Sequence, residues 1–388
     1  MGERRRYSMD NLHRSGSIGR REFLRLLGGA AAAGAIGTAC RVAGGAGLPG
    51  PDTVPGTPFL PTGPTPTYHA ESAPTMIPAS PTPESLVGRV ALIRTTDRTQ
   101  GVRRALDLLG VNPVAGKTVF LKPNFNSVDP APGSTHIDTL RALVERLWEV
   151  GAGSITLGDR SGMGDTRAVM QARGVFDLAS ELGFETIVFD ELPAEGWILA
   201  DAPASHWRRG FSLARPAVEA QAIVQTCNLK THRYGGHFTL SLKNSVGLAA
   251  KVVPGAGYNY MTELHNSADQ RRMIAEINAA YAPALIVLDG VEAFTSGGPD
   301  VGNKVEASVV LAGVDRIAVD AVGVAILRLL GTTAEVERGR VFEQEQIARA
   351  VELGLGVAQP EAITILADEA EGRAYADQLR MILEADGS

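Results

Sequence analysis

The sequence predicts an α/β fold, with a mostly parallel sheet, helices on both faces and a site at the C-terminal ends of the strands. Short apolar runs alternate with helical patterns over roughly 300 residues, which is typical of βαβ units. Four of these runs end in polar, loop-forming residues, at 122–124, 158–162, 227–232 and 289–290. Because parallel strands end at one edge of a sheet, we expect these groups to converge there.

The elements follow from the apolar pattern and its interruptions. Pro123 is expected to end the second strand, and Ser134 and Thr135 to cap the next helix. Asp315 is expected to precede an apolar helix, while residues 191–215 fit either a hairpin or a lid. Strands are predicted at 89–94, 118–121, 154–157, 186–189, 222–224, 284–288, 305–311 and 362–366, and helices at 101–109, 136–150, 268–280, 316–330 and 343–353.

The N-terminal region has the pattern of an export signal. Arg20 and Arg21 precede a short apolar run at 26–39, which predicts twin-arginine translocation to the periplasm or the cell surface. The run is too short for a comfortable membrane span. Cys40 ends a lipobox-like Gly-Thr-Ala-Cys, which predicts a lipid anchor, with simple cleavage as the alternative. Membrane contact is therefore expected only through the signal or the anchor.

Composition separates a linker from the folded domain, and it argues against nucleic acid as a partner and against an iron–sulfur cluster. Residues 41–88 are rich in Pro, Gly and Thr and predict a disordered linker before a folded domain at 89–388. Without residues 1–40 the chain has 30 basic and 40 acidic residues, which argues against nucleic acid. If Cys40 carries a lipid, Cys227 is the only cysteine left, so we then expect no internal disulfide. The chain has no CxxC pair, so we expect no cysteine-bound iron–sulfur cluster.

The segment from 225 to 247 carries the densest set of chemically active side chains. It is expected to form a loop and a helix after the strand at 222–224. Lys230, His232 and Lys243 are the predicted catalytic residues. Lysine and asparagine donors suit a carboxylate or a phosphate, so a small anionic molecule is the expected partner.

Other strand ends add candidate ligands for the same site. A divalent metal is a possible cofactor, because Asp and His side chains recur at these ends. Each residue also has an ordinary alternative as a turn or capping residue. The predicted ligand-binding residues are Lys122, Asn124, His136, Ser161 and Asn244, and the predicted metal residues are Asp159, His232, His237, Asp289 and Asp320.

A succession of motifs resembles the domain-of-unknown-function family 362. The motifs are KPN (122–124), TH (135–136), LGD with a serine (157–161), NLKTH (228–232), T-x3-KN-x2-G (239–247), VLDG (287–290), GGP-x2-G (297–302) and DRIAVDAV (315–322). The resemblance implies an α/β fold with a site at these motifs and no assigned reaction. Members of this family are often exported by twin-arginine signals, and others are fused to an iron–sulfur module that this chain lacks.

A second likeness concerns the central segment alone. His232, a glycine pair, Phe238 and Lys243 resemble a run in the nickel-pincer lactate racemase family, without the glycine that precedes its lysine. We expect an exported enzyme, or a cofactor- or metal-binding domain, that acts on a small anion. The alternatives are a lipid-anchored solute- or metal-binding protein without catalysis and, third, an electron-transfer accessory.

Overall fold

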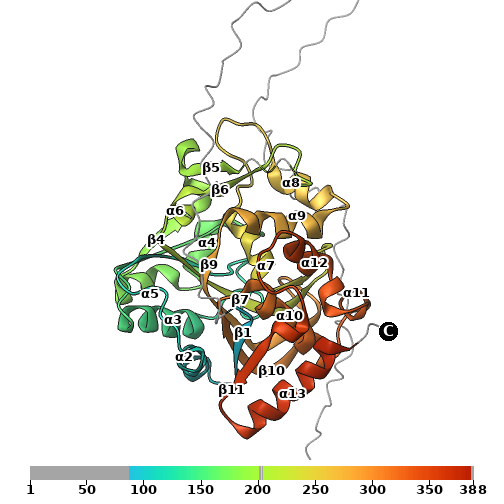
Figure 1. Cartoon of the computed structure of the whole chain (residues 1–388). Coiled ribbons are helices and arrows are strands. Elements are labelled where there is room, and N and C mark those ends of the chain that lie inside the picture. Colours follow the sequence, from blue (N-terminus) through green and yellow to red (C-terminus); the bar gives the residue numbers. More distant parts are fainter. Residues whose placement is uncertain (1–86, 201, 203, 386–388) are drawn as a thin grey trace, which may run out of the picture. The chain divides into compact units, whose positions relative to one another are not determined.

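The computed structural model describes residues 87–385, except 201 and 203. They form a nine-stranded sheet with helices on both faces and a separate two-stranded sheet (Figure 1). The predicted export signal, Cys40 and all of the predicted linker except residues 87 and 88 lie outside the described residues.

The strands and helices alternate along much of the chain, as expected for an α/β domain. The strands are β1 (Arg89–Arg94), β2 (Thr118–Lys122), β3 (Ser154–Asp159), β4 (Glu185–Val188), β5 (Trp197–Ala200), β6 (Phe211–Ala214), β7 (Ala222–His232), β8 (His237–Thr239), β9 (Pro283–Gly297), β10 (Gly302–Gly313) and β11 (Thr364–Ala367). The helices are α2 (Arg98–Leu109), α3 (Ile137–Glu149), α4 (Thr166–Ala172), α5 (Val175–Leu182), α6 (Arg215–Val218), α7 (Ser241–Asn244), α8 (Tyr260–Asn266), α9 (Gln270–Ile277), α10 (Arg316–Leu329), α11 (Ala334–Glu337), α12 (Glu345–Glu352) and α13 (Ala370–Glu384).

The sheet is mixed but mostly parallel, which confirms the predicted fold class. Its order is β11-β1-β10-β9-β7-β2-β3-β4, and β8 pairs with β7. Strands β9, β7, β2 and β3 are parallel neighbours, so the four polar strand ends do point the same way. The antiparallel pairs are β1 with β10, β9 with β10, and β7 with β8.

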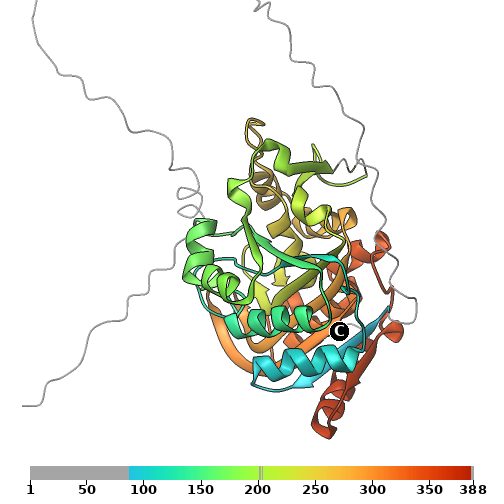
Figure 2. The same ribbon diagram turned by 90° about the vertical axis from the view of Figure 1, so that its left-hand side faces the viewer.

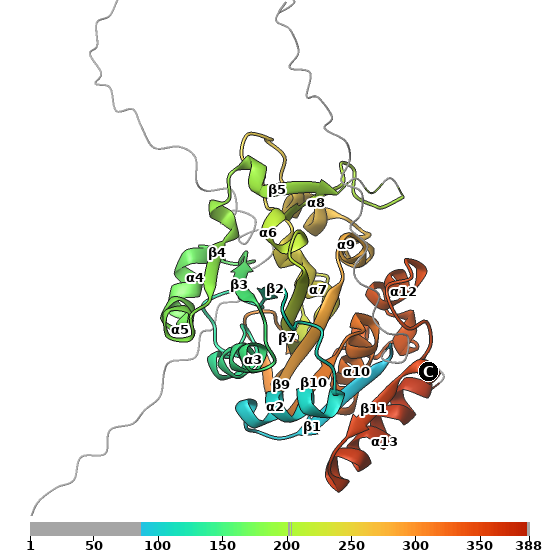
Figure 3. The same cartoon turned by 60° about the vertical axis from the view of Figure 1, so that its left-hand side comes forward.

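Apolar side chains that alternate along the strands build a core on each face of the sheet. Val90 and Leu92 of β1 pack into the core that includes α10, α12 and α13. Ala91 and Ile93 join the opposite core with α2 and α3, as period-two alternation requires. Figures 1 and 3 show α2 and α3 on one side of the sheet and α10 and α13 on the other.

Strands β5 and β6 form a hairpin within the segment for which the sequence allowed a hairpin or a lid. Strands β5 and β6 pair antiparallel, from Trp197 with Ala214 to Ala200 with Phe211. Trp197 and Phe211 are buried in a third core with α8 and α9. In the side view of Figure 2 this green region lies at the opposite end of the domain from α13, in red.

Strands β7 and β9 run much further than the sequence pattern indicated. The prediction that residues 225–247 form a loop and a helix was wrong for 225–232, because β7 continues to His232. Asn228 of β7 pairs with Asp289 of β9 inside the sheet, at positions where the sequence indicated turns. The register shifts after Asn228, and again between Glu306 and Val309 of β10. These irregularities, which are β-bulges, allow both strands to continue past the turn-forming residues.

The start of one helix differs from the prediction, and another helix was not predicted. His136, rather than Ser134 or Thr135, is the N-cap of α3, and its Nδ1 accepts a hydrogen bond from the Asp138 backbone N–H. Helix α13 was missed, although its buried residues Gly372, Ala376, Leu379 and Leu383 recur at helical spacing.

Among the described residues, no helix combines the length and apolar character needed to cross a membrane.

Asp315 joins the start of α10 to the turn before β11, which yields a stability prediction. Its Oδ1 accepts from the Ile317 and Ala318 N–H groups, and its Oδ2 accepts from Val357 N–H. We expect Asp315→Ala to lower the free energy of unfolding by about 3 kcal/mol, because a cap is lost and a buried N–H loses its acceptor. Chemical denaturation of the full chain measures this loss.

Asp97→Ala is the matched control. Asp97 caps α2 through one bond to the Gln100 N–H at an exposed position. Its replacement should cost about 1 kcal/mol. Equal losses in the two variants would show that Asp315 acts only as a helix cap.

Candidate functional site

Lys122, the last residue of β2, is a buried ammonium group with three acceptors. Its Nζ lies 2.7 Å from Asp159 Oδ1 and donates to the Pro123 carbonyl at 2.5 Å and to Asn244 Oδ1 at 3.1 Å. Burial lowers the pKa of Lys122, and the charge of Asp159 opposes that shift. The side chain is thus held as an ion pair at the strand end.

Asp159, the last residue of β3, is fully engaged by protein donors. Its Oδ2 accepts from Phe125 N–H, and its Oδ1 accepts from Arg160 N–H, both at 2.7 Å. The backbone at Gly247 passes directly over this ion pair. A Cβ at Gly247 would lie 2.6 Å from both Asp159 Oδ1 and Lys122 Nζ, so only glycine fits there.

Lys230, in the middle of the extended part of β7, also has an acceptor for each of its protons. Its Nζ donates to Asn124 Oδ1 at 2.9 Å and to the carbonyls of Gly133 and Pro299 at 2.5 and 3.1 Å. Burial, and then the charge of Lys243, lowers the pKa of Lys230 to about 7. Lys230 therefore ties two loops to the sheet.

Two asparagines connect the lysines across the end of β2. Asn124 Nδ2 donates to Asn244 Oδ1 at 3.5 Å, and Asn244 Nδ2 donates to the Thr226 carbonyl at 3.2 Å. With the lysine contacts above, this gives a continuous chain from Lys122 through Asn244 and Asn124 to Lys230. The predicted residues Lys122, Asn124, Lys230 and Asn244 therefore do come together, as a hydrogen-bonded network.

Lys243 differs from the other two lysines because its Nζ has neither a hydrogen-bond acceptor nor an ion-pair partner among the described residues. It is partly exposed, on the short helix α7. Burial and the nearby charge of Arg160 lower its pKa to about 8. Asp320 of α10 holds the start of this helix by accepting from Ser241 and Leu242 N–H at 2.7 and 2.9 Å.

His232, the last residue of β7, lies beside Lys243 across the backbone of Gly236. A Cβ built on Gly236 would lie 2.7 Å from Lys243 Cε and 2.9 Å from His232 Nδ1. Burial and the charge of Lys243 hold the pKa of His232 well below its ordinary value, so the ring is neutral near pH 7. Its buried Nδ1 has no hydrogen-bond partner in the described part of the chain.

Two basic residues near Lys243 were not assigned a role from the sequence. The buried Arg160 guanidinium donates to the carbonyls of Ala249 and Val246 at 2.7 and 2.6 Å and pairs with no carboxylate in the structure as described. Desolvation and the charge of Lys243 lower the pKa of His265 on α8. The position of Arg160 in GDRSG, directly after β3, was the sequence feature that could have indicated its role. Nothing in the sequence indicated His265.

We call Lys122, Lys230, Lys243, Arg160 and His232 the basic cluster.

Three of the predicted residues outside the basic cluster, His136, Ser161 and Asp289, are also outside its hydrogen-bond network. Asp289 accepts from Arg98 Nε at 2.9 Å and from Thr139 Oγ1 at 2.6 Å, near the capping residue His136. Burial and the charge of Arg98 lower the pKa of His136. Ser161 is buried; its N–H donates to Thr166 Oγ1, and its hydroxyl lacks a partner among the described residues. His136 and Asp289 thus share a second, separate polar region.

The five predicted metal residues are not brought together as one site. No group of three or more His, Cys, Asp or Glu side chains in the described part of the chain is arranged to hold a metal ion. Asp159, Asp289 and Asp320 each use both oxygens on protein donors. His237 pairs with His232 across β7 and β8, but Arg271 and Glu345 are among the charges that affect its ring. The carboxylates instead fix strands and helices.

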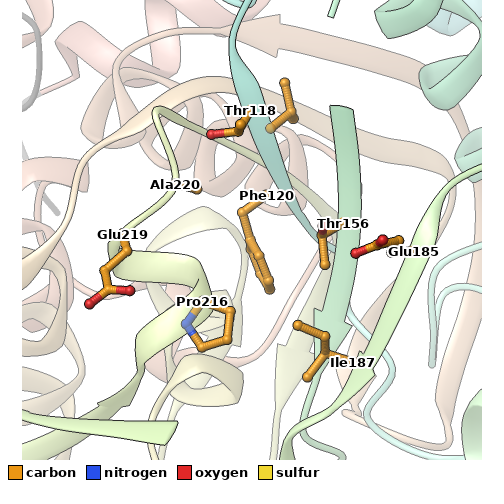
Figure 4. Close-up of a pocket in the computed structure, with 9 residues that line it drawn as sticks. Thr118, Phe120, Thr156, Glu185, Ile187, Pro216, Glu219 and Ala220 are labelled. Carbon is orange, nitrogen blue, oxygen red and sulfur yellow. The ribbon is translucent and has the colours of Figure 1, made fainter. Parts of the chain in front are cut away.

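A hollow of about 250 Å³ lies at the opposite end of β2 from Lys122 (Figure 4). It starts at Thr118, the first residue of β2, and Phe120, Ile187 and Pro216 line it. Glu185 and Glu219 supply its charged side chains. An acidic rim over an apolar floor does not suit an anion, so this hollow is separate from the candidate site.

Comparison with known proteins places the basic cluster within a described family. The family model described as "Domain of unknown function (DUF362)" matches residues 119–325, a range that contains every residue of the cluster. The thylakoid-associated protein sll1697 of Synechocystis sp. is 28% identical over 259 residues, which cover 63% of this chain and 76% of that protein. The lactate racemase apoprotein from Thermoanaerobacterium thermosaccharolyticum has a TM-score of 0.35 at 18% identity. That match covers 60% of this chain and 56% of the racemase chain.

The lowered pKa of Lys230 predicts a pH-dependent stability. The folded pKa of about 7 is below the ordinary 10.5, so between these values the unfolded chain binds more protons and stability rises with pH. From pH 7 to 9 the free energy of unfolding of the wild type should rise by about 2 kcal/mol relative to Lys230→Met. Urea denaturation of both proteins at each pH measures the difference. A constant difference would mean that Lys230 titrates normally in the fold.

Proposed function

The chain belongs to the DUF362 family, whose description names no activity, and we propose that its basic cluster binds a small anion, a carboxylate or a phosphate, at Lys243. Lys122, Lys230 and the two asparagines form the rigid floor of this site. Arg160 adds a positive charge. The anion accepts hydrogen bonds from the Lys243 ammonium group and pairs with its charge.

The observation that carries the proposal is the imbalance of buried charge. Lys122 pairs with Asp159, and the charges of Asp300 and Asp129 act on Lys230. Among the described residues, no carboxylate forms an ion pair with Lys243 or with Arg160, whose charge lowers the pKa of Lys243. Buried charges in proteins are normally paired, because an isolated charge loses its hydration without compensation. Asp190, the carboxylate whose charge acts most strongly on Arg160, already pairs with Lys251. An anionic ligand supplies the missing negative charge.

His232 gives the site the capacity for chemistry beside the anion. A neutral imidazole with an unpartnered Nδ1 can accept a proton from a bound ligand, and the lysines stabilise the negative charge that then develops. This favours an enzyme. A binding protein without catalysis would use the same cluster, and the complete set of acceptors around Lys122 and Lys230 suits a rigid binding site. Turnover separates the two, since the second predicts saturable binding alone.

Thermal denaturation of the full chain with inorganic phosphate or malonate tests the proposal. We expect a saturable rise in melting temperature with at least one of these anions. Lys243→Met should weaken the apparent affinity on the order of tenfold or more, because a charge-assisted hydrogen bond is lost. Gly236→Ala should do the same, because its methyl group occupies the space between Lys243 and His232.

Lys304→Met is the matched control, since Lys304 is exposed and pairs with Glu292. It should leave the response to both anions unchanged. If neither anion stabilises the wild type, or if Lys243→Met responds as the wild type does, the cluster is not an anion site centred on Lys243.

A further inference from the structure

The chain uses lysine sparingly and concentrates it at the basic cluster. Of its 37 basic residues only six are lysines: Lys117, Lys122, Lys230, Lys243, Lys251 and Lys304. Three of the six belong to the cluster, and Lys251 lies close enough for Arg160 to lower its pKa. Most other ion pairs use arginine. Arginine grips carboxylates and phosphates with two parallel bonds and keeps its proton, whereas a buried lysine can lose its proton and act as an amine.

The hydrogen bonds distinguish one lysine from the others. Lys122 and Lys230 each direct their ammonium groups at three protein acceptors. An amine held in this way cannot approach a ligand without breaking those contacts. Lys243 has none of these restraints, its side chain is partly exposed, and it lies next to His232.

We propose that Lys243 is a nucleophilic amine that forms an imine with the aldehyde or ketone group of a ligand that also carries a carboxylate or phosphate. This inference rests on the proposed anion site, because the remaining positive charges hold the anionic end of the ligand. The inference goes beyond the anion site in two respects: Lys243 forms a covalent bond, and the ligand carries a carbonyl group.

The electrostatics of the cluster supply the neutral amine that the step needs. Burial and the charge of Arg160 lower the pKa of Lys243 to about 8. At pH 7.5 such a lysine is unprotonated roughly a hundredfold more often than an ordinary exposed lysine. A desolvated lysine next to another cation is a recognised way to activate an amine.

The step balances with the groups present and needs no oxidant or reductant. The nitrogen lone pair forms a bond to the carbonyl carbon, and the carbon–oxygen π pair moves to the oxygen. His232 Nδ1, which has no partner in the described residues, accepts a proton from the nitrogen and passes it to the oxygen, which gives a carbinolamine. The second proton of the nitrogen then moves to the hydroxyl by the same route, the carbon–oxygen bond breaks, and water leaves. The nitrogen lone pair forms the carbon–nitrogen double bond of the neutral imine.

Reductive trapping on the full chain tests the imine. Glyoxylate, an aldehyde with one carboxylate, is incubated with the protein and reduced with borohydride, and mass spectrometry of peptides quantifies carboxymethyl-lysine at each of the six lysines. At pH 7.5 we expect Lys243 to be labelled at least about tenfold faster than the solvent-accessible Lys117 and Lys304. Its labelling should reach half its maximum near pH 8, whereas that of Lys304 should keep rising.

Thermal denaturation with glyoxylate but without borohydride separates this inference from the proposed function. If glyoxylate stabilises the protein and Lys243 is labelled no faster than Lys304, the anion site stands and the imine is wrong. Preferential labelling of Lys230 would also contradict the assignment to Lys243. If glyoxylate neither stabilises the protein nor labels Lys243, it gives no support to the anion site and contradicts the imine.

Discussion

Burial of two lysines, Lys122 and Lys230, is the constraint on which the end of the sheet depends. Lys122 pairs with Asp159, and Asn244 and Asn124 carry the hydrogen bonds on to Lys230. Removal of one partner of a buried ion pair typically costs about 3–5 kcal/mol, because the other charge remains in the interior. The loops after β2 and β3 are therefore fixed by the same contacts that define the site.

Two glycines, Gly236 and Gly247, let the backbone pass close to the lysine side chains of this network. Gly247 passes over Lys122 and Asp159, and Gly236 lies between Lys243 and His232, at distances that exclude a side chain. Asp320 of α10 orients the short helix of Lys243 by accepting hydrogen bonds from its first two backbone N–H groups. The site thus combines residues from β2, β3, β7 and α7, and its one unpartnered amine, within the described residues, is at the point where these elements meet.

Much of the fold and part of the site could be predicted from the sequence. Alternating apolar runs predicted the sheet and its edge, and the polar ends of β2, β3 and β7 do supply Lys122, Asp159 and His232. The extension of β7 through Asn228 could not be predicted, because it depends on pairing with β9 and on bulges set by tertiary contacts. Nor could the sequence show that Asp159, Asp289 and Asp320 each accept a hydrogen bond from a backbone N–H group, at positions that form no common site among the described residues.

The ionisation of Lys243 tests the account most directly, and the small number of lysines makes it measurable by nitrogen-15 NMR of labelled lysine side chains. A pKa of about 8 is expected for Lys243 in the ligand-free protein, with the lysine resonance assigned by its loss in Lys243→Arg. Inorganic phosphate or malonate should raise that pKa, because a bound anion favours the charged form. An ordinary pKa near 10.5, or one that both anions leave unchanged, would contradict an anion site centred on this amine.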